Sequence, residues 1–221
     1  MAQAAGVDGC RGGWVVVTDE VAFVCPDFGA VLDSLPRDTV VAVDIPIGLE
    51  DGYVAGGRRA DSISRRMLGQ PRGTSVFPAP ARCCFGVRSL EQAREHGCRI
   101  NKQGIDILKK IEDVDSAISP ALQERVYEVH PEVSFAAMNG DRPLPSRKTR
   151  PDGRTERRDL LERADIVIPE RPRPYRDVKE DDLLDACVAR WSALRIASGT
   201  SSRVPDPPPM DARGLRMEIC W

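Results

Sequence analysis

Five carboxylates occupy positions at which a folded α/β sheet could bring them together: Asp8, Asp44, Glu132, Asp182 and Asp185. Asp8 and Asp44 end apolar runs that have the composition of strands, and Glu132 follows a third such run. Asp182 and Asp185 are three residues apart, so they project from neighbouring positions of a predicted helix. Because open α/β sheets place their sites at strand ends, we expect these side chains to converge.

Such a group of carboxylates has a natural partner in a divalent cation. Carboxylates held together repel one another unless positive charge separates them. Mg²⁺ and Mn²⁺ prefer oxygen ligands and accept phosphate oxygens beside them. Two such ions ~4 Å apart can activate water and stabilise the leaving oxygen of a phosphodiester. We therefore predict metal-dependent hydrolysis, with all five acids as catalytic candidates.

Three of these acids also have a simpler interpretation. Asp8 could cap the turn at Gly9, and Asp44 could form a salt bridge with an arginine. Asp182 could be an acid of the first helical turn, which the helix dipole favours. An unpaired charge in the apolar run around Asp44 is nevertheless costly, which favours a functional role there.

The segment from residue 51 to 110 is basic, with twelve Lys and Arg side chains against five Asp and Glu, in a chain whose net charge is -2. One interpretation is a solvated helix face. The other is a wall that holds the phosphate backbone of a substrate without reading its sequence. Aromatic residues are only 5% of the chain, so base stacking is not strongly favoured. The predicted substrate-binding residues are Arg58, Arg65, Arg82, Lys102 and, on a later loop, Lys148.

The elements that must position these residues follow from the apolar patterns. Strands are predicted at 5–8, 14–18, 21–25, 39–45 and 125–129, the first three as an antiparallel meander with a tight turn at the glycines between 9 and 13. Helices are predicted at 28–35, 58–68 with Gly69 as its C-cap, within 90–124, and at 181–196.

Other segments read as connections. Loops are predicted at 71–82 and from 140 towards a helix near 158, and 166–168 is a short strand or a loop. Residues 215–221 could return as an edge strand. We therefore predict a single domain over 1–221, with a largely helical insertion at about 51–124 and a Pro-rich tail at about 199–221.

Composition limits the class of protein. The chain is 41% hydrophobic and 30% charged, enough for a folded core. No segment approaches the ~20 apolar residues of a membrane span, and no signal peptide is evident. The seven cysteines lack paired CxxC spacing, so we expect reduced, mostly buried thiols, with Cys83 and Cys84 structural, in a cytoplasmic protein.

The order of elements resembles the RNase H-like superfamily, closest in layout to Holliday-junction resolvases. More narrowly, five motifs resemble a family of predicted RNase H-like fold nucleases that is catalogued as a domain of unknown function: GVDGCRGGW (6–14), VAVDIPIGL (41–49), SVFPAPAR (75–82), YEVHPEVSF (127–135) and DDLLDA (181–186). The resemblance implies a three-layer α/β fold with a mixed sheet, an antiparallel β-meander followed by parallel strands. It also implies that Asp8, Asp44, Asp182 and Asp185 face Mg²⁺ or Mn²⁺. Resolvase-like enzymes commonly carry a glutamate on the central strand, where this chain has Asp44.

The function expected from these features is a metal-dependent nuclease that hydrolyses phosphodiester bonds in nucleic acid. Two alternatives remain open: a non-catalytic RNase H-like binding or scaffold domain, and a nucleotide phosphohydrolase or phosphotransferase of the same superfold. Nucleic acid is the expected partner, no membrane is expected, and the chain could be a monomer or a homodimer.

Overall fold

The computed structural model describes residues 3–19, 21–174 and 176–221. The chain divides into two compact units. Unit 1 comprises Met1–Ile45, Arg125–Ser202 and Cys220–Trp221, and unit 2 comprises Pro46–Glu124 and Arg203–Ile219. Every predicted acidic site residue belongs to unit 1.

Within the described residues, unit 1 is built on a five-stranded mixed sheet of order β3-β2-β1-β4-β5. Antiparallel pairing joins β1 to β2 and β2 to β3, and parallel pairing joins β1 to β4 and β4 to β5. The meander and the parallel strands are therefore as predicted. The strands are β1 (Ala4–Cys10), β2 (Gly13–Val17), β3 (Ala22–Cys25), β4 (Val40–Val43) and β5 (Val126–Glu128).

The turn between β1 and β2 requires a glycine. Gly13 has a φ of 132°, and a Cβ there would lie 2.0 Å from the carbonyl oxygen of Cys25. No other residue type has both the conformational freedom and the small size for this position. This confirms the predicted glycine-dependent tight turn.

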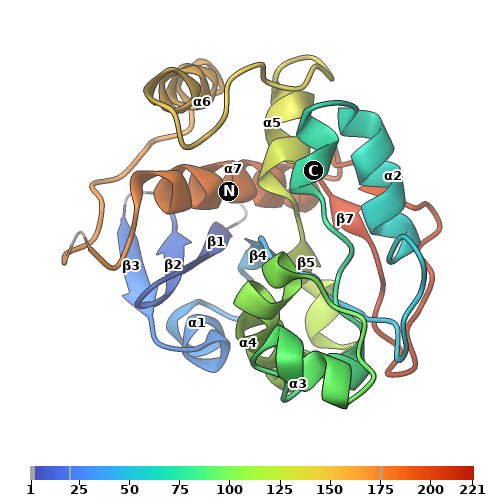
Figure 1. The fold of residues 1–221 in the computed structure, drawn as a ribbon. Coiled ribbons are helices and arrows are strands. Elements are labelled where there is room, and N and C mark those ends of the chain that lie inside the picture. Colours follow the sequence, from blue (N-terminus) through green and yellow to red (C-terminus); the bar gives the residue numbers. More distant parts are fainter. Residues whose placement is uncertain (1–2, 20, 175) are drawn as a thin grey trace. The chain divides into compact units, whose positions relative to one another are not determined.

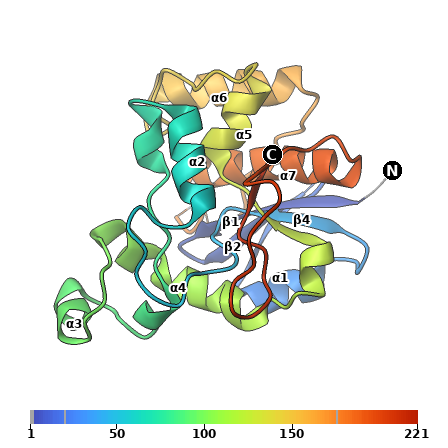
Figure 2. The same ribbon diagram turned by 90° about the vertical axis from the view of Figure 1, so that its right-hand side faces the viewer.

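Helices cover both faces of the sheet in unit 1. In Figures 1 and 2, α1 (Phe28–Ser34) lies on one side of the sheet and α7 (Glu180–Ala197) on the other. Both views place α5 (Pro131–Met138) and α6 (Pro151–Arg163) beyond α7, away from the strands. All residues from Leu183 to Arg190 are buried, so other elements cover this part of α7 on all its faces.

Small residues let α7 lie close to the strands. A Cβ on Gly6 would come within 2.0 Å of the carbonyl oxygen of Ala186 and 2.2 Å of the backbone nitrogen of Arg190. On the neighbouring strand, Ala42 packs in one cluster with Ala189 and Ala193. The distance between α7 and the sheet, and with it the position of the first turns of α7, depends on these contacts.

We expect Gly6→Ala to destabilise the protein by about 1–3 kcal/mol, because overpacking a close backbone contact forces the helix to move. The free energy of unfolding from urea denaturation measures the effect. Gly52→Ala is the matched control, because a Cβ at Gly52 meets nothing within 4 Å. Equal stability of the two variants would contradict the close approach.

Unit 2 is largely helical. Its helices are α2 (Arg59–Leu68), α3 (Leu90–Glu95) and α4 (Lys102–Ala117), with 3-10 turns η1 (Arg72–Ser75), η2 (Arg82–Cys84) and η3 (Leu122–Glu124). Gly69 ends α2 with a φ of 58°, as predicted for its C-cap. A short sheet pairs β6 (Arg203–Val204) with β7 (Ile219–Cys220).

Three local predictions need correction. No helix is predicted directly after β5, where Pro131 begins α5, for which its fixed φ is suited. The predicted loop 71–82 contains η1, whereas residues 166–168 form a loop, one of the two alternatives predicted for them. The edge strand predicted at 215–221 is limited to β7, of which Cys220 bridges Val129 in parallel.

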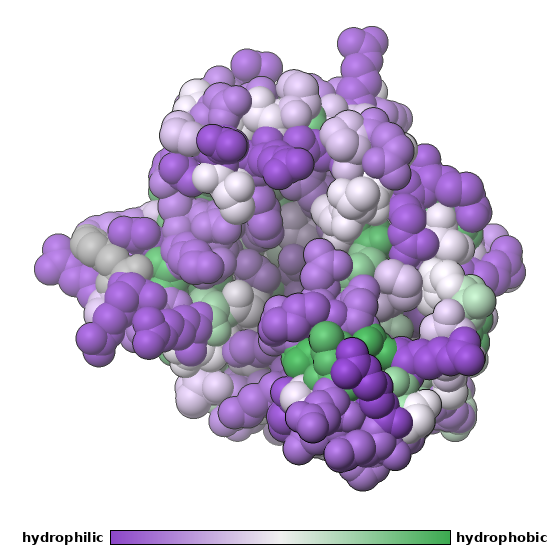
Figure 3. Space-filling view, in the orientation of Figure 1, coloured by the Kyte–Doolittle hydropathy of each residue, from purple (hydrophilic) through white to green (hydrophobic). Residues whose placement is uncertain are grey.

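The part of the chain that the structure describes contains no helix with the length and apolar character needed to cross a bilayer. Hydrophilic residues cover most of the face in Figure 3, and a small hydrophobic area lies where Figure 1 shows α3 and α4.

Candidate functional site

Strand register brings Asp8 and Asp44 side by side. Val7 pairs with Val43 in the parallel ladder, and the two aspartates are the next residues on the two strands. The backbone nitrogen of Asp44 donates a hydrogen bond to the carbonyl oxygen of Val7 at 3.0 Å. Asp8 is buried, Asp44 is half-buried, and their side chains project on the same face of the sheet because residues in parallel register share a face.

That face is the one covered by α7. Gly6 meets Ala186, and Asp8 lies two residues after Gly6, on the same side of β1. Asp185 directly precedes Ala186 and is 1% exposed. Asp182 lies one turn earlier and is half-buried, and its carboxylate accepts a hydrogen bond from the backbone nitrogen of Lys179 at 2.8 Å.

Burial and mutual repulsion both act on these acids. Burial, followed by the charges of Asp44 and Asp185, holds the pKa of Asp8 well above its usual range. Burial raises the pKa of Asp44 to about 6, with Asp185 adding to the rise and His130 and Lys148 opposing it. Burial also raises the pKa of Asp185. These shifts mean that full ionisation of the acidic cluster, which comprises Asp8, Asp44 and Asp185, lowers the stability of the folded protein.

Asp182 stands at the margin of this cluster. Burial raises its pKa, the hydrogen bond from Lys179 opposes the rise, and the charge of Asp185 adds to it. The same carboxylate completes a capping box at the start of α7. Asp182 is thus an acid of the first helical turn, as the simpler interpretation predicts, and also a neighbour of the acidic cluster.

Lys148 supplies the counter-charge. Its ammonium forms an ion pair with the Asp185 carboxylate, and its own side chain remains 40% exposed. Asp185, and after it Asp8 and Asp44, raise the pKa of Lys148. The loop that carries Lys148 passes close to the first turn of α6. Gly153 leaves room for this loop, because a Cβ there would lie 2.0 Å from the carbonyl oxygen of Arg147.

One oxygen of the cluster stays unsatisfied. Oδ2 of Asp185 meets Lys148, whereas Oδ1 is buried and has no hydrogen-bond partner among the described residues. An unsatisfied buried carboxylate oxygen costs free energy, so its persistence calls for a functional explanation.

Glu132 lies in the first turn of α5 and is buried against Arg157, to which it is ion-paired. Arg157 also donates to the carbonyl oxygen of Gly153 at 2.9 Å and lies 5.3 Å from the centre of the Phe135 ring. Glu132 contributes to the raised pKa values of Asp44 and Asp185, so it belongs to the surroundings of the cluster. No sequence spacing indicated Arg157 as its partner.

The other predicted substrate-binding residues belong to unit 2 and have partners there. Arg58 is 1% exposed and donates to Asp61 and to the carbonyl oxygens of Ile47 and Gly48. Arg65 donates to the carbonyl oxygens of Val76 and Gly56. The geometry gives both side chains a structural role within unit 2.

Arg82 and Lys102 are also engaged. Arg82 pairs with Asp51, Asp115 and Asp211, the last at 2.7 Å. Lys102 pairs with Asp106 one turn along α4, and both side chains are exposed. The sequence offered a solvated helix face as the simpler interpretation, which describes Lys102 but not the ion-paired Arg82.

Known proteins provide a family but no activity. A family model described as "Protein of unknown function (DUF429)" matches residues 6–210. No curated protein and no solved structure matches the chain. The match confirms the resemblance to a family catalogued as a domain of unknown function, while the nuclease activity and the RNase H-like fold expected from that resemblance stay predictions.

Proposed function

The chain belongs to the DUF429 family of proteins of unknown function, and from its acidic cluster we propose a divalent-metal-dependent hydrolase of phosphodiester bonds in nucleic acid. The observation that carries this proposal is the convergence of Asp8, Asp44 and Asp185, all with raised pKa values, beneath α7. A fold gains no stability from such a group by itself, and strongly shifted groups cluster at functional sites.

The donor set fits Mg²⁺ or Mn²⁺. Its ligands are carboxylate oxygens, including the unsatisfied Oδ1 of Asp185, and these hard cations select such ligands. Asp8, Asp44 and Asp185 would hold the ion, with Asp182 at its edge. Among the described residues, no three carboxylates each bring an oxygen within 4.8 Å of the others. Binding therefore requires the carboxylates to draw together, with the ion taking over the balancing role of Lys148.

When bound, such an ion polarises a phosphoryl oxygen and lowers the pKa of water. The chain supplies the rest. The paired strands β1 and β4 and the closely packed α7 fix the backbone positions from which the carboxylates project, and side-chain rotation brings the carboxylates together. Lys148, released from Asp185, can hold a phosphate oxygen with its ammonium, because its side chain is 40% exposed.

We also propose the RNase H-like architecture for unit 1. The support is the strand order, in which an antiparallel meander precedes parallel strands. Asp8 lies in β1, Asp44 directly follows β4, and Asp185 lies in the second turn of α7. A cytoplasmic location is likewise a proposal, which rests on seven free cysteines.

Calorimetric titration of Mn²⁺ into wild type and an Asp8→Asn, Asp185→Asn double variant tests the proposal. We expect wild type to bind the ion, the double variant to lose binding, and exposed Asp159→Asn to behave as wild type. Cleavage of single-stranded, duplex and branched DNA and RNA should follow the same ranking. Metal binding that survives in the double variant would remove the basis of the proposal.

The Lys148 ion pair favours a second candidate, a non-catalytic binding or scaffold domain. An ammonium beside Asp185 balances part of the cluster's charge with no metal present. On this alternative neither wild type nor variant binds Mn²⁺ at millimolar concentration, and the folded protein still retains nucleic acid in a filter-binding assay.

A further inference from the structure

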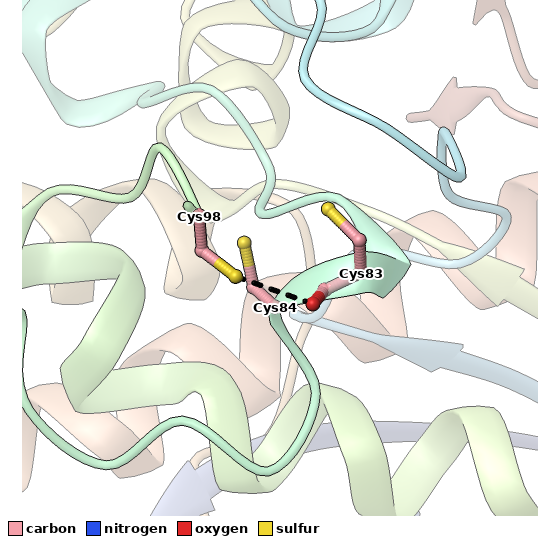
Figure 4. A group of neighbouring side chains, drawn as sticks. All are labelled: Cys83, Cys84 and Cys98. Atoms are coloured by element: carbon pink, nitrogen blue, oxygen red, sulfur yellow. Dashed lines mark hydrogen bonds between the residues drawn. The ribbon is translucent and has the colours of Figure 1, made fainter. Parts of the chain in front are cut away.

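Three cysteines of unit 2 form a second group of ligating side chains. The Sγ atoms of Cys83, Cys84 and Cys98 all lie within 4.8 Å of one another. No local sequence pattern indicates this group, because Cys98 is distant from the adjacent pair and no CxxC spacing is present. Figure 4 shows the side chains gathered from η2 and from the connection between α3 and α4.

Local structure holds the three thiols in place. The nitrogen of Cys83 donates to the carbonyl oxygen of Asp51 at 3.0 Å, and that of Cys84 donates to Ala81 at 2.9 Å. Gly97, with a φ of 67°, turns the chain back after α3, and the Cys98 nitrogen then donates to the carbonyl oxygen of Ala93 at 2.8 Å. The ion pairs of Arg82 anchor η2 from its other end.

The surroundings suit a thiolate site that is open on one side. Cys84 is buried in an apolar cluster with Val87, Ala93 and Leu108, and Cys98 packs against that cluster. Cys83 is exposed, so solvent and ions reach the group from its side. Such an arrangement offers three sulfur ligands and leaves a further position for water or another donor.

We propose that Cys83, Cys84 and Cys98 form a three-thiolate binding site for one thiophilic cation, Zn²⁺ or Cu⁺. Sulfurs that share one tetrahedral zinc lie roughly 3.8 Å apart, as follows from Zn–S bonds of about 2.3 Å, so small side-chain movements complete the site. Each ligating thiol gives its proton to solvent, and the cation balances the thiolate charges. A disulfide would use only two of the three sulfurs. Soft thiolate ligands select these cations over Mg²⁺ or Mn²⁺.

The neighbouring thiols also disfavour one another's ionisation without a cation. The three Sγ atoms lie within 4.8 Å of one another, and like charges held this close repel. A bound cation removes this repulsion, as it does for any group of like charges. This site is independent of the acidic cluster, because all three cysteines belong to unit 2.

The test is anaerobic titration of Co²⁺ into the reduced full-length chain, followed by the sulfur-to-cobalt charge-transfer absorption in the near ultraviolet. We expect one ion to bind per chain. Cys83→Ser and Cys98→Ser should each weaken binding at least about tenfold, because the loss of even an outer-shell partner of a metal site has an effect of that size. Cys83 is exposed, so its variant is expected to fold, and circular dichroism verifies this. Cys25→Ser, which removes a buried thiol of unit 1, should bind as wild type.

Displacement of Co²⁺ by Zn²⁺ or by Cu⁺ then identifies the preferred cation. Folded wild type without a charge-transfer band would overturn the proposal, as would a band unchanged in both folded variants. Formation of a Cys83–Cys98 disulfide in air by a protein that binds no Co²⁺ when reduced would replace it with a redox role.

Discussion

Asp44→Asn is expected to stabilise the metal-free protein at pH 7.5 and at the same time to abolish Mn²⁺ binding. The carboxylate at position 44 is held among Asp185, Glu132 and Asp8, and burial raises its pKa to about 6. An amide of the same shape removes one charge from the cluster. The loss of favourable interactions with His130 and Lys148 offsets part of the gain.

The pH dependence of this effect has a definite sign. The folded protein binds the Asp44 proton more tightly than the unfolded chain, whose carboxyl has its ordinary pKa of 3.8. The charge of Asp44 therefore costs little below about pH 4, and the cost grows as the pH rises towards 6 and then stays constant. At pH 7.5 we expect Asp44→Asn to gain on the order of 1–3 kcal/mol over wild type, and at pH 4 almost nothing.

Urea unfolding of both proteins in the presence of a chelator, from pH 4 to 8, measures the difference. The difference in unfolding free energy between the two proteins cancels the contributions of groups that both retain. One such group is Asp211, whose pKa is lowered, chiefly by its hydrogen bond with Arg82, and whose effect on stability has the opposite sign. Asp159→Asn controls for the loss of an exposed charge. A variant less stable than wild type at pH 7.5 would mean that Asp44 is a structural residue.

Lys148→Met is expected to destabilise the metal-free protein and to raise its affinity for Mn²⁺, the opposite of both effects expected for Asp44→Asn. Breaking an ion pair with a buried partner costs up to about 3–5 kcal/mol, less where the carboxyl can take up a proton. Asp185 is 1% exposed and has a raised pKa, so we expect a loss of about 1–3 kcal/mol at pH 7.5 and a smaller loss at pH 5. With the competing ammonium gone, Mn²⁺ should bind at least about tenfold more tightly.

The matched control is Lys102→Met. It also removes a lysine from an ion pair, but the pair with Asp106 is exposed on both sides and such pairs are worth about 0–1 kcal/mol. Because Lys148 is also a predicted phosphate contact, its variant should bind nucleic acid more weakly while binding Mn²⁺ more tightly. Unchanged Mn²⁺ affinity would separate Lys148 from the metal site.

The sequence by itself determined the strands of the meander, the central strand and the elements that carry most of the acidic residues. Alternating and β-branched runs predicted the meander and the central strand, and the turn at Gly13 was required by its backbone. Because Asp8 and Asp44 end such runs, their approach follows from parallel pairing alone. The helix bearing Asp182 and Asp185 was evident from its apolar spacing.

Only the tertiary structure decided which charges meet. That Lys148 pairs with Asp185, Arg157 with Glu132, and Arg82 with Asp211 depends on contacts between residues 25 to 129 positions apart, which no local pattern encodes. The same holds for the gathering of Cys98 with the adjacent cysteines. Spacing along one strand or helix specifies which face a side chain occupies, whereas the partner on that face is specified by how separate elements pack.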